Sequence, residues 1–208
     1  PRVYFQKQFL ILAIRITSLT KSITMSISGA VLKPDFLKII QSQSNELPFE
    51  VSSDGLEVLK YKSKTSRQSL EITSSSTTNP NPNERKVSIQ AQDGFIYLTT
   101  KRLVFITATQ GDIQSFVIDL NLAPLLQLSH KVQAPWIGSN YWEFMFRSSS
   151  QDGIATDGLP KNQYFVGKLR FHDGGLFEFC EILNKTLNDA VNNRDIDDTL
   201  PSYNEVQQ

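Results

Sequence analysis

Four cationic side chains fall close together near residue 60. Lys60, Lys62 and Lys64 alternate within "LKYKSK", and Arg67 follows three residues later. Residues two apart on a strand share one face, so this spacing predicts a row of positive charge that could bind an anionic lipid head group. Alternating lysines also occur on the solvated face of an edge strand, where they discourage aggregation. Both interpretations remain open from the sequence.

A second stretch with recognisable chemistry is a tetrapeptide near the end of the chain, formed by Leu200, Pro201, Ser202 and Tyr203. Pro201 fixes its own φ and biases Leu200 toward an extended backbone, so the segment visits polyproline II at low entropic cost. Tyr203 adds an amphipathic ring that aromatic-lined grooves can bind. The alternative is a solvated chain end in which a proline and a tyrosine fall two residues apart by chance.

Motifs of common catalytic and cofactor sites are missing from the sequence. It has no phosphate-binding glycine-rich loop, no Gly-x-Ser-x-Gly elbow and no His-Glu-x-x-His helix. His130 and His172 stand far apart, and Cys180 is the only cysteine. Metal sites and disulfide frameworks draw on clusters of these residues, so we expect neither. We also expect no catalytic residue, no cofactor and no enzymatic activity.

Composition limits the partners of the chain. Its 208 residues carry 21 basic and 21 acidic side chains. Because no net charge attracts polyanions, we expect no direct nucleic-acid binding. With 39 % hydrophobic residues, the chain can bury one ordinary core.

The beginning of the sequence differs from the rest. The apolar run at residues 9–14 ends at Arg15, and it is shorter than the roughly 20 residues of a transmembrane helix. It also lacks the flanks of a secretory signal, so we expect no transmembrane segment. Met25 is followed by an ordinary protein start. Our hypothesis is that residues 1–24 are a non-native or disordered extension that precedes the biological start.

Short apolar runs dominate the middle of the chain. Residues 95–98 and 103–106 are β-branched or aromatic, and polar "TTKR" separates them, which predicts an antiparallel hairpin. Similar runs raise the prediction to about seven strands, as in an all-β sheet or barrel. The further runs are "GLEVLKYKSK", "KVSIQA", "IQSFVIDL", "LLQLSHKV", "WEFMFRS" and "YFVGKLRF". Two polar inserts, residues 73–85 and 147–163, have little to bury and are expected to be mobile loops.

The spacing of the apolar residues changes from a strand-like to a helix-like period only near the C-terminal end of the sequence. In "FCEILNKTLNDAVNN" the apolar residues recur every three or four positions, which predicts a closing amphipathic helix. Cys180 falls on its apolar face and is interpreted as a packed thiol. An Asp-Gly-Gly turn at residues 173–175 precedes the helix. His172 beside it is expected to be exposed or to cap the helix, and not to be catalytic.

The block "WIGSNYW" allows two interpretations. Its aromatic residues could form a binding loop, because exposed aromatic side chains mark interfaces. We favour a tight turn at Gly138, with Trp136, Tyr141 and Trp142 filling the end of the barrel.

Several segments together carry a family resemblance. "GFIYLTTKRLVFI" resembles the core hairpin of a GRAM domain, a variant of the pleckstrin-homology fold. "QSFVIDL", "APWIGSNYWE" and "KLRFHDGGLFEF" follow in the order of that family. Among GRAM proteins, the chain is most similar to the WW-domain-binding proteins, which carry proline-tyrosine motifs behind the domain. Those motifs are usually Pro-Pro-x-Tyr, whereas this chain has one Leu-Pro-Ser-Tyr.

The resemblance implies a mainly β fold: a pleckstrin-homology-like GRAM barrel of about seven antiparallel strands, capped by one C-terminal α-helix, with disordered tails. It implies a non-enzymatic adaptor in the cytoplasm and the nucleus, whose partners are WW-domain proteins such as ubiquitin ligases or transcription co-regulators. We expect a lead-in at residues 25–48, the GRAM domain at 49–192 and the tail at 193–208. Weak anionic-lipid contact through Lys60, Lys62, Lys64 and Arg67 is the alternative function.

Overall fold

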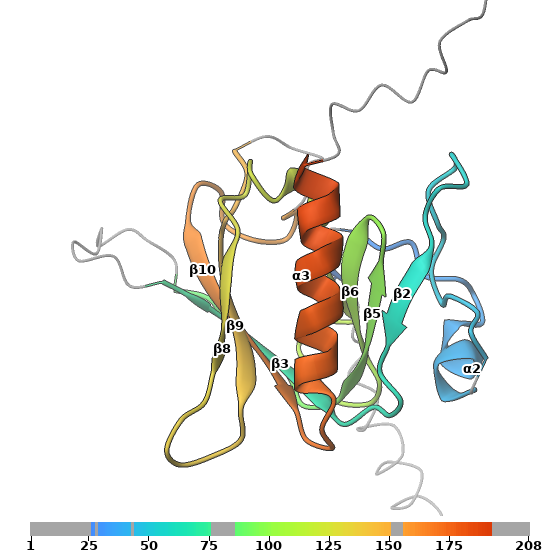
Figure 1. Cartoon of the computed structure of the whole chain (residues 1–208), viewed down its shortest axis with the longest axis horizontal. Helices are drawn as coiled ribbons and strands as arrows, with labels where there is room; N and C mark the ends of the chain where they lie inside the picture. The colour runs from blue at the N-terminus through green and yellow to red at the C-terminus, as the bar shows by residue number, and fades with distance from the viewer. Residues whose placement is uncertain (1–25, 28, 43, 76–85, 151–155, 193–208) are drawn as a thin grey trace, which may run out of the picture.

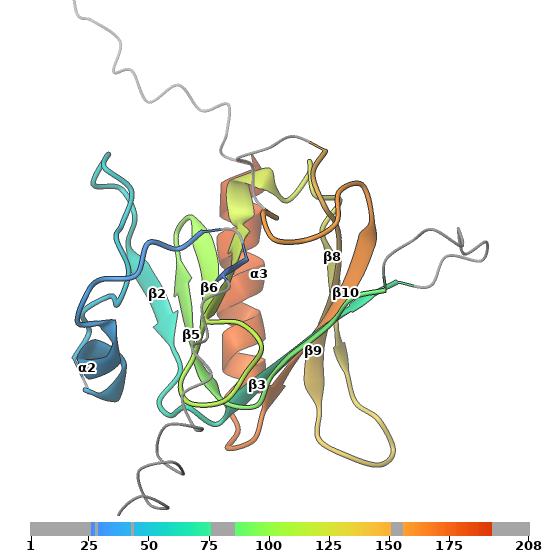
Figure 2. The same ribbon diagram turned by 180° about the vertical axis from the view of Figure 1, so that it is seen from behind.

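A computed structural model describes residues 26–27, 29–42, 44–75, 86–150 and 156–192 of the chain. They form two five-stranded sheets and one long helix (Figures 1 and 2). The first sheet has the order β1-β7-β6-β5-β2. Its strands are β1 Ser26–Ile27, β7 Ser115–Asp119, β6 Arg102–Thr107, β5 Gly94–Thr99 and β2 Leu59–Lys62.

The second sheet has the order β4-β3-β10-β9-β8. Its strands are β4 Ser88–Ala91, β3 Gln68–Ser74, β10 Tyr164–Phe171, β9 Tyr141–Arg147 and β8 Ser129–Gln133. The ladders in both sheets are antiparallel, except for the short β1–β7 pair. Two isolated bridges connect the sheets at one corner, where Arg67 pairs with Gly94 and Ala91 pairs with Gly111.

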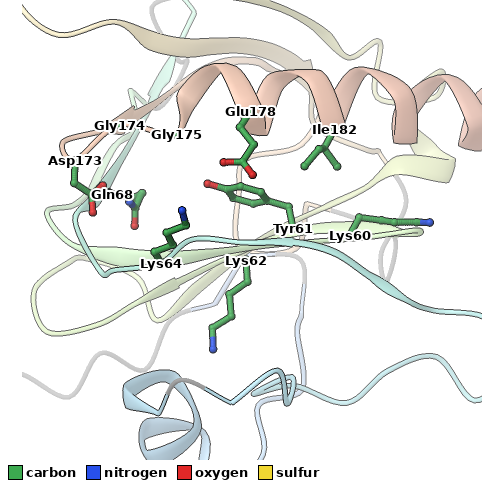
Figure 3. A pocket seen from close by; sticks show the side chains of 10 residues that line it. All are labelled: Lys60, Tyr61, Lys62, Lys64, Gln68, Asp173, Gly174, Gly175, Glu178 and Ile182. Atoms are coloured by element: carbon green, nitrogen blue, oxygen red, sulfur yellow. Dashed lines mark hydrogen bonds between the residues drawn. The ribbon is translucent and has the colours of Figure 1, made fainter.

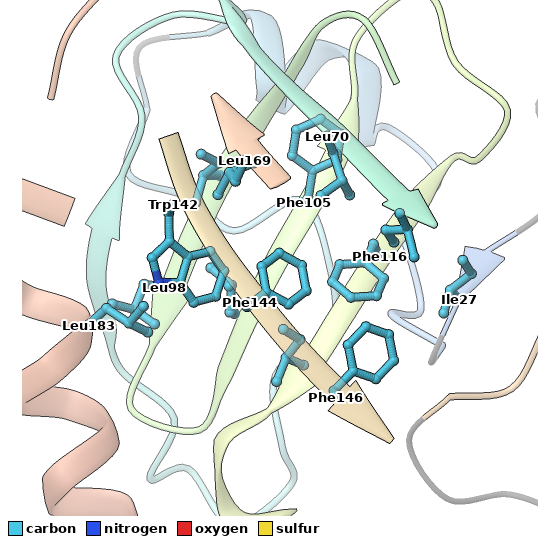
Figure 4. Close-up of a cluster of buried hydrophobic side chains, with 14 of the residues drawn as sticks. Ile27, Leu70, Leu98, Phe105, Phe116, Trp142, Phe144, Phe146, Leu169 and Leu183 are labelled. Carbon is cyan, nitrogen blue, oxygen red and sulfur yellow. The ribbon is translucent and has the colours of Figure 1, made fainter. Parts of the chain in front are cut away.

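Helix α3, Leu176–Asn192, closes the side between the two sheets (Figure 1). Its buried residues are Leu176, Phe179, Cys180, Leu183 and Thr186. The four apolar residues among them pack on the inward faces of both sheets in one continuous core, and Figure 4 shows Leu183 beside Leu98 and Trp142. Aromatic rings fill the centre of this core, where Trp142 stacks on Phe144 with ring centres 4.4 Å apart. None of the described helices is long and apolar enough to cross a membrane.

A second, smaller cluster lies on the outer face of the first sheet. Phe49 packs edge-on against Tyr97, with 5.7 Å between ring centres. Ile40 of the short helix α2, Phe36–Gln41, and Val104 of β6 belong to the same cluster. The lead-in segment therefore covers a sheet face that would otherwise expose apolar side chains to water.

The mainly β architecture with one closing C-terminal helix is confirmed. The predicted hairpin is formed by β5 and β6, and the Asp-Gly-Gly turn places Gly174 and Gly175 at positive φ. The described residues form ten strands, more than the roughly seven expected, and β1 and β3 correspond to none of the predicted runs. In β3 the alternation is visible, since Leu70 and Ile72 are buried.

Part of one polar insert packs instead of remaining solvated. Leu159 is buried in the core, and the Ser148 hydroxyl donates to the Pro160 carbonyl oxygen at 2.6 Å. The expectation that residues 147–163 have little to bury was therefore wrong at Leu159. Residues 1–24 lie outside the described part of the chain.

Candidate functional site

Strand β2 does not present its cationic residues on one face. Leu59 lies opposite Thr99, while Tyr61 lies opposite the very next residue of β5, Leu98. Lys60 is thus an extra residue, a β-bulge, and it interrupts the two-residue alternation that the sequence prediction assumed. The expected row of charge is broken at this point.

Lys62 consequently faces the α2 side of the sheet (Figure 3). Its ammonium group donates to the Ser44 carbonyl oxygen at 2.7 Å and lies 5.7 Å from the centre of the Tyr97 ring. Partial burial lowers the pKa of this ammonium group. Lys62 therefore fastens the segment after α2 to the first sheet, and its charge is not directed toward Lys60 or Lys64.

Lys60 and Lys64 border a hollow of about 350 Å³ between β2 and the first turns of α3. Their side chains extend in opposite directions along it (Figure 3). Neither ammonium group forms an ion pair or hydrogen bond with another residue that the structure describes. The hollow is also lined by Tyr61, Lys62, Gln68, Asp173, Gly174, Gly175, Glu178 and Ile182. The Lys62 ammonium group, however, points away from it (Figure 3). Arg67 lies in the adjacent turn but does not line the hollow.

Tyr61 forms one wall of the hollow. Its ring meets Phe179 edge-on, with 5.5 Å between ring centres, and its hydroxyl lies so close to Gly175 that a Cβ there would be 3.3 Å from it. Burial raises the pKa of Tyr61 to about 12, and the charges of Glu178 and Asp173 act in the same direction. The phenol is therefore protonated at neutral pH and can donate a hydrogen bond.

Carboxylates balance the lysines in this hollow. Asp173 accepts hydrogen bonds from the Thr65 hydroxyl and, at 3.0 Å, from Gln68 Nε2. Glu178 lines the opposite wall, and its carboxylate forms no hydrogen bond or ion pair with another residue that the structure describes. The ammonium groups of Lys60 and Lys64 and the carboxylates of Asp173 and Glu178 thus all border the hollow. Such a site suits a ligand with mixed charges better than a multiply phosphorylated one, because each carboxylate repels an anion.

A serine–histidine contact lies nearby on β3 and the turn after β10. Ser69 Oγ is 2.9 Å from His172 Nε2, and His172 is exposed as expected. A nucleophilic serine needs a third group to orient its histidine. Among the described residues no such group binds the other ring nitrogen, and no cluster of three metal-ligating side chains occurs.

For the loop between β8 and β9, residues 134–140, the prediction is wrong at Trp136, although Gly138 has the positive φ expected of a turn. Trp142 is 1 % exposed in the core, but Trp136 is fully exposed and Ile137 is 92 % exposed. Trp136 therefore does not fill the end of the barrel. Tyr141 is half-buried beneath two cations, with the Lys168 ammonium 5.9 Å and the Arg170 guanidinium 5.1 Å from its ring centre. The binding-loop interpretation fits Trp136 and Ile137.

Cys180 is the packed thiol that the helical pattern predicts. It is 8 % exposed, and burial raises its pKa to about 11, so little reactive thiolate forms at neutral pH. His130 lies 5.7 Å from the Trp142 ring, and burial lowers the pKa of its imidazole. Neither residue belongs to the hollow.

The tetrapeptide of Leu200, Pro201, Ser202 and Tyr203 lies outside the described residues. Its proposed docking role therefore rests on its sequence. The residues that sequence reasoning missed are Tyr61, Gly175 and Glu178, which the hollow brings together. The Asp-Gly-Gly turn that leads into the helix could have indicated these residues, because it places the first turn of α3 beside β2.

No protein-family model matches this chain, and no curated protein matches it. One solved structure that is similar is the Vps36 N-terminal PH domain. The two chains share 16 % sequence identity and align with a TM-score of 0.42. The alignment covers 71 % of this chain and 89 % of the PH domain.

Proposed function

We propose that this chain is a non-catalytic adaptor of the GRAM type, which docks WW-domain proteins through Leu200, Pro201, Ser202 and Tyr203. The observation that carries the proposal is the tetrapeptide itself, eight residues beyond the last residue of α3, Asn192. Its proline favours the extended backbone that WW grooves select, and its tyrosine supplies the anchor. The sheets and helix then serve as the scaffold that carries this peptide, in the cytoplasm and the nucleus.

Binding should be modest. Leu200 stands where the more usual motif has a first proline, so one groove contact is lost. We expect a dissociation constant of tens of micromolar, or about 6–7 kcal/mol. Phosphorylation of Tyr203 should abolish binding, because a charge of about −1.5 to −2 would have to enter an apolar groove.

Titration of a panel of WW domains, including those of ubiquitin ligases, tests the proposal. The ligand is a peptide of residues 195–208, compared with Tyr203→Ala and with Ser202→Ala as the matched control. We expect at least one WW domain to bind the unchanged peptide and the Ser202→Ala peptide but not the Tyr203→Ala peptide. If every domain binds all three peptides equally or none at all, the adaptor proposal fails. Affinity capture with the full chain and its Tyr203→Ala variant then identifies the partners.

A second candidate function is weak contact with anionic lipid. The observation that favours it concerns Lys60 and Lys64 beside the hollow. Their ammonium groups form no ion pair or hydrogen bond within the described part of the chain. The original set also included Lys62 and Arg67, but Lys62 is engaged on the other side of β2. Each exposed lysine near an acidic bilayer contributes about 1 kcal/mol, so two lysines give only a weak attraction.

Co-sedimentation with phosphatidylserine vesicles tests whether Lys60 and Lys64, rather than Lys62, bind the lipid. The variant with Lys60→Glu and Lys64→Glu should lose most of its lipid binding. Lys62→Glu is the control for a single charge reversal on the opposite face of β2, and it is compared with Lys60→Glu and Lys64→Glu made one at a time. Equal loss in the three single variants would contradict the assignment to the hollow, and unchanged binding in all variants would exclude lipid contact through β2.

A further inference from the structure

We propose that the loop between β8 and β9 is an anchor that inserts Trp136 and Ile137 into the interface of an anionic phospholipid bilayer. The inference builds on the second candidate function, contact with anionic lipid, but assigns it to a different part of the surface. The insertion itself does not involve the hollow, although Lys64 at its edge lies at the same end of the molecule as the loop.

The loop has the composition of an interfacial anchor. Residues 134–140 contain no charged side chain, and Pro135, Trp136 and Ile137 are all exposed. A soluble surface rarely leaves a whole tryptophan in water beside an equally exposed isoleucine. Tryptophan has an apolar ring system with one polar N–H group, and it concentrates at the boundary between water and lipid.

The shape of the loop favours a bilayer over a protein groove. β8 and β9 pair as far as Gln133 and Tyr141, and the loop continues beyond this last pair. In both views it extends past the other turns at the lower end of the molecule (Figures 1 and 2). A protruding apolar tip can enter a lipid interface without any conformational change in the sheet behind it.

The same end of the molecule carries cations that would face the lipid head groups. Strand register brings the ends together, because Phe171 pairs with Gln68 at the start of β3 and Arg170 pairs with Tyr141 at the start of β9. The connection before β3, with Lys64 and Arg67, therefore emerges at the end that carries the loop (Figure 2). Exposed cations beside an uncharged apolar tip are complementary to an anionic leaflet.

A further apolar side chain lies at this end. Phe177 is 68 % exposed in the first turn of α3, directly after the Asp-Gly-Gly turn. It is a second point at which the lower end presents apolar surface to a bilayer. Phe177 adds area but does not define the site, because it stands alone on its helix face.

Intrinsic fluorescence reads the insertion directly, because the chain has two tryptophans and Trp142 is already buried. The full chain is titrated with vesicles of phosphatidylcholine alone and with vesicles that also contain phosphatidylserine. We expect a blue shift of Trp136 emission with the anionic vesicles, and quenching by lipids brominated near the head group. High salt should weaken both effects.

Co-sedimentation with the same vesicles uses Trp136→Ala, with Leu56→Ala as the matched control. Leu56 is 69 % exposed in the segment before β2, where its carbonyl oxygen accepts a hydrogen bond from the hydroxyl of Thr100 in the β5–β6 turn. Trp136→Ala should lower the vesicle partition coefficient about tenfold, while Leu56→Ala leaves it unchanged. Both variants should keep the parental melting temperature, because both side chains are in solvent.

The outcomes separate this inference from the lipid candidate on which it builds. If the chain sediments with anionic vesicles but Trp136 emission does not shift and Trp136→Ala binds equally, lipid contact stands and the anchor is overturned. If no vesicle binds, both are overturned. If emission shifts with protein concentration in the absence of lipid, the tip is a contact between proteins, and the membrane assignment is overturned.

Discussion

The ring of Phe144 lies directly over the backbone of Gly167, its partner in the neighbouring strand β10. A Cβ added at Gly167 would be 2.0 Å from Cζ of Phe144, which is far inside any van der Waals contact. Gly167 is therefore required for space and not for an unusual backbone angle. Phe144 in turn stacks on Trp142 and is 1 % exposed, so it has no room to move away.

Gly167→Ala should destabilise the protein by about 1–3 kcal/mol or more, because the new methyl group overlaps a ring that is packed on all sides. Phe144→Leu should recover part of this loss when the two changes are combined. Urea unfolding of the two single variants and the double variant measures the coupling between the sites. Strict additivity of the two losses would show that the ring and the glycine do not constrain each other.

Two phenylalanines two residues apart in α3 should behave oppositely. Phe179 is fully buried against Tyr61, Trp142 and Phe171, and Phe179→Ala should cost about 3–5 kcal/mol. Phe177 is 68 % exposed, so Phe177→Ala should change the free energy of unfolding by less than about 0.5 kcal/mol. Thermal melting of both variants decides the matter, with Phe105→Ala as a second core variant. Similar melting temperatures for Phe177→Ala and Phe179→Ala would contradict this placement of the helix.

The sequence predicted the positions of the strands and the helix more reliably than it predicted which side chains of each strand face the core. Hairpin β5–β6 and helix α3 were predictable because their apolar residues recur with a clear period. In β5, however, residues 95–98 are apolar without interruption, so the pattern could not show which side faces the helix. Phe95 and Tyr97 belong to the outer cluster with Val104, whereas Ile96 and Leu98 belong to the main core.

The functional surface was less predictable for two physical reasons. A bulge at Lys60 depends on pairing with β5, and a lysine-rich strand gives no local sign of it. The exposure of Trp136 depends on where β8 and β9 stop pairing, and aromatic composition alone favours burial. Strand pairing decided both positions. Of the four cations expected on one face, only Lys60 and Lys64 keep their ammonium groups beside the hollow, and Trp136, expected to fill the barrel end, is exposed in a loop.

Shortening the polar insert after β3 should leave the protein folded. Ser74 pairs with Phe165 in the sheet, and its hydroxyl accepts a hydrogen bond from the Val87 N–H group at 2.8 Å. A deletion should therefore begin after Ser75, and removal of residues 76–83 should shift the melting temperature by only a few degrees. Loop-closure entropy changes by about 0.6 kcal/mol per doubling of length, which is the basis of this expectation. Removal of residues 74–83 is the informative comparison, because it also cuts the strand and should lower the melting temperature further. A large loss on removal of 76–83 alone would show that this segment packs.

Acid should weaken the fold through Glu57, whose side chain is completely buried. Burial alone would raise the pKa of its carboxyl group, but Arg102 donates to both oxygens, at 2.9 and 2.8 Å, and the Ser52 N–H and Thr99 hydroxyl groups donate as well. Together these partners hold the pKa below its ordinary value near 4.5.

Because the pKa in the folded state is the lower one, the stability that Glu57 contributes is present above the ordinary value and is lost as pH falls through the folded value. Glu57→Gln should cost about 3 kcal/mol at pH 7, since it leaves Arg102 without its counter-charge. Below the folded pKa, the wild-type carboxyl group is neutral like the amide, so the gap between the two proteins should shrink. Urea unfolding of both proteins at pH 7, 5, 4 and 3 measures this gap. Glu46→Gln is the control, because its ion pair with Lys33 is on the surface and should contribute less than about 1 kcal/mol at any pH. A Glu57→Gln gap that stays constant from pH 7 to pH 3 would contradict the assignment of acid sensitivity to this ion pair.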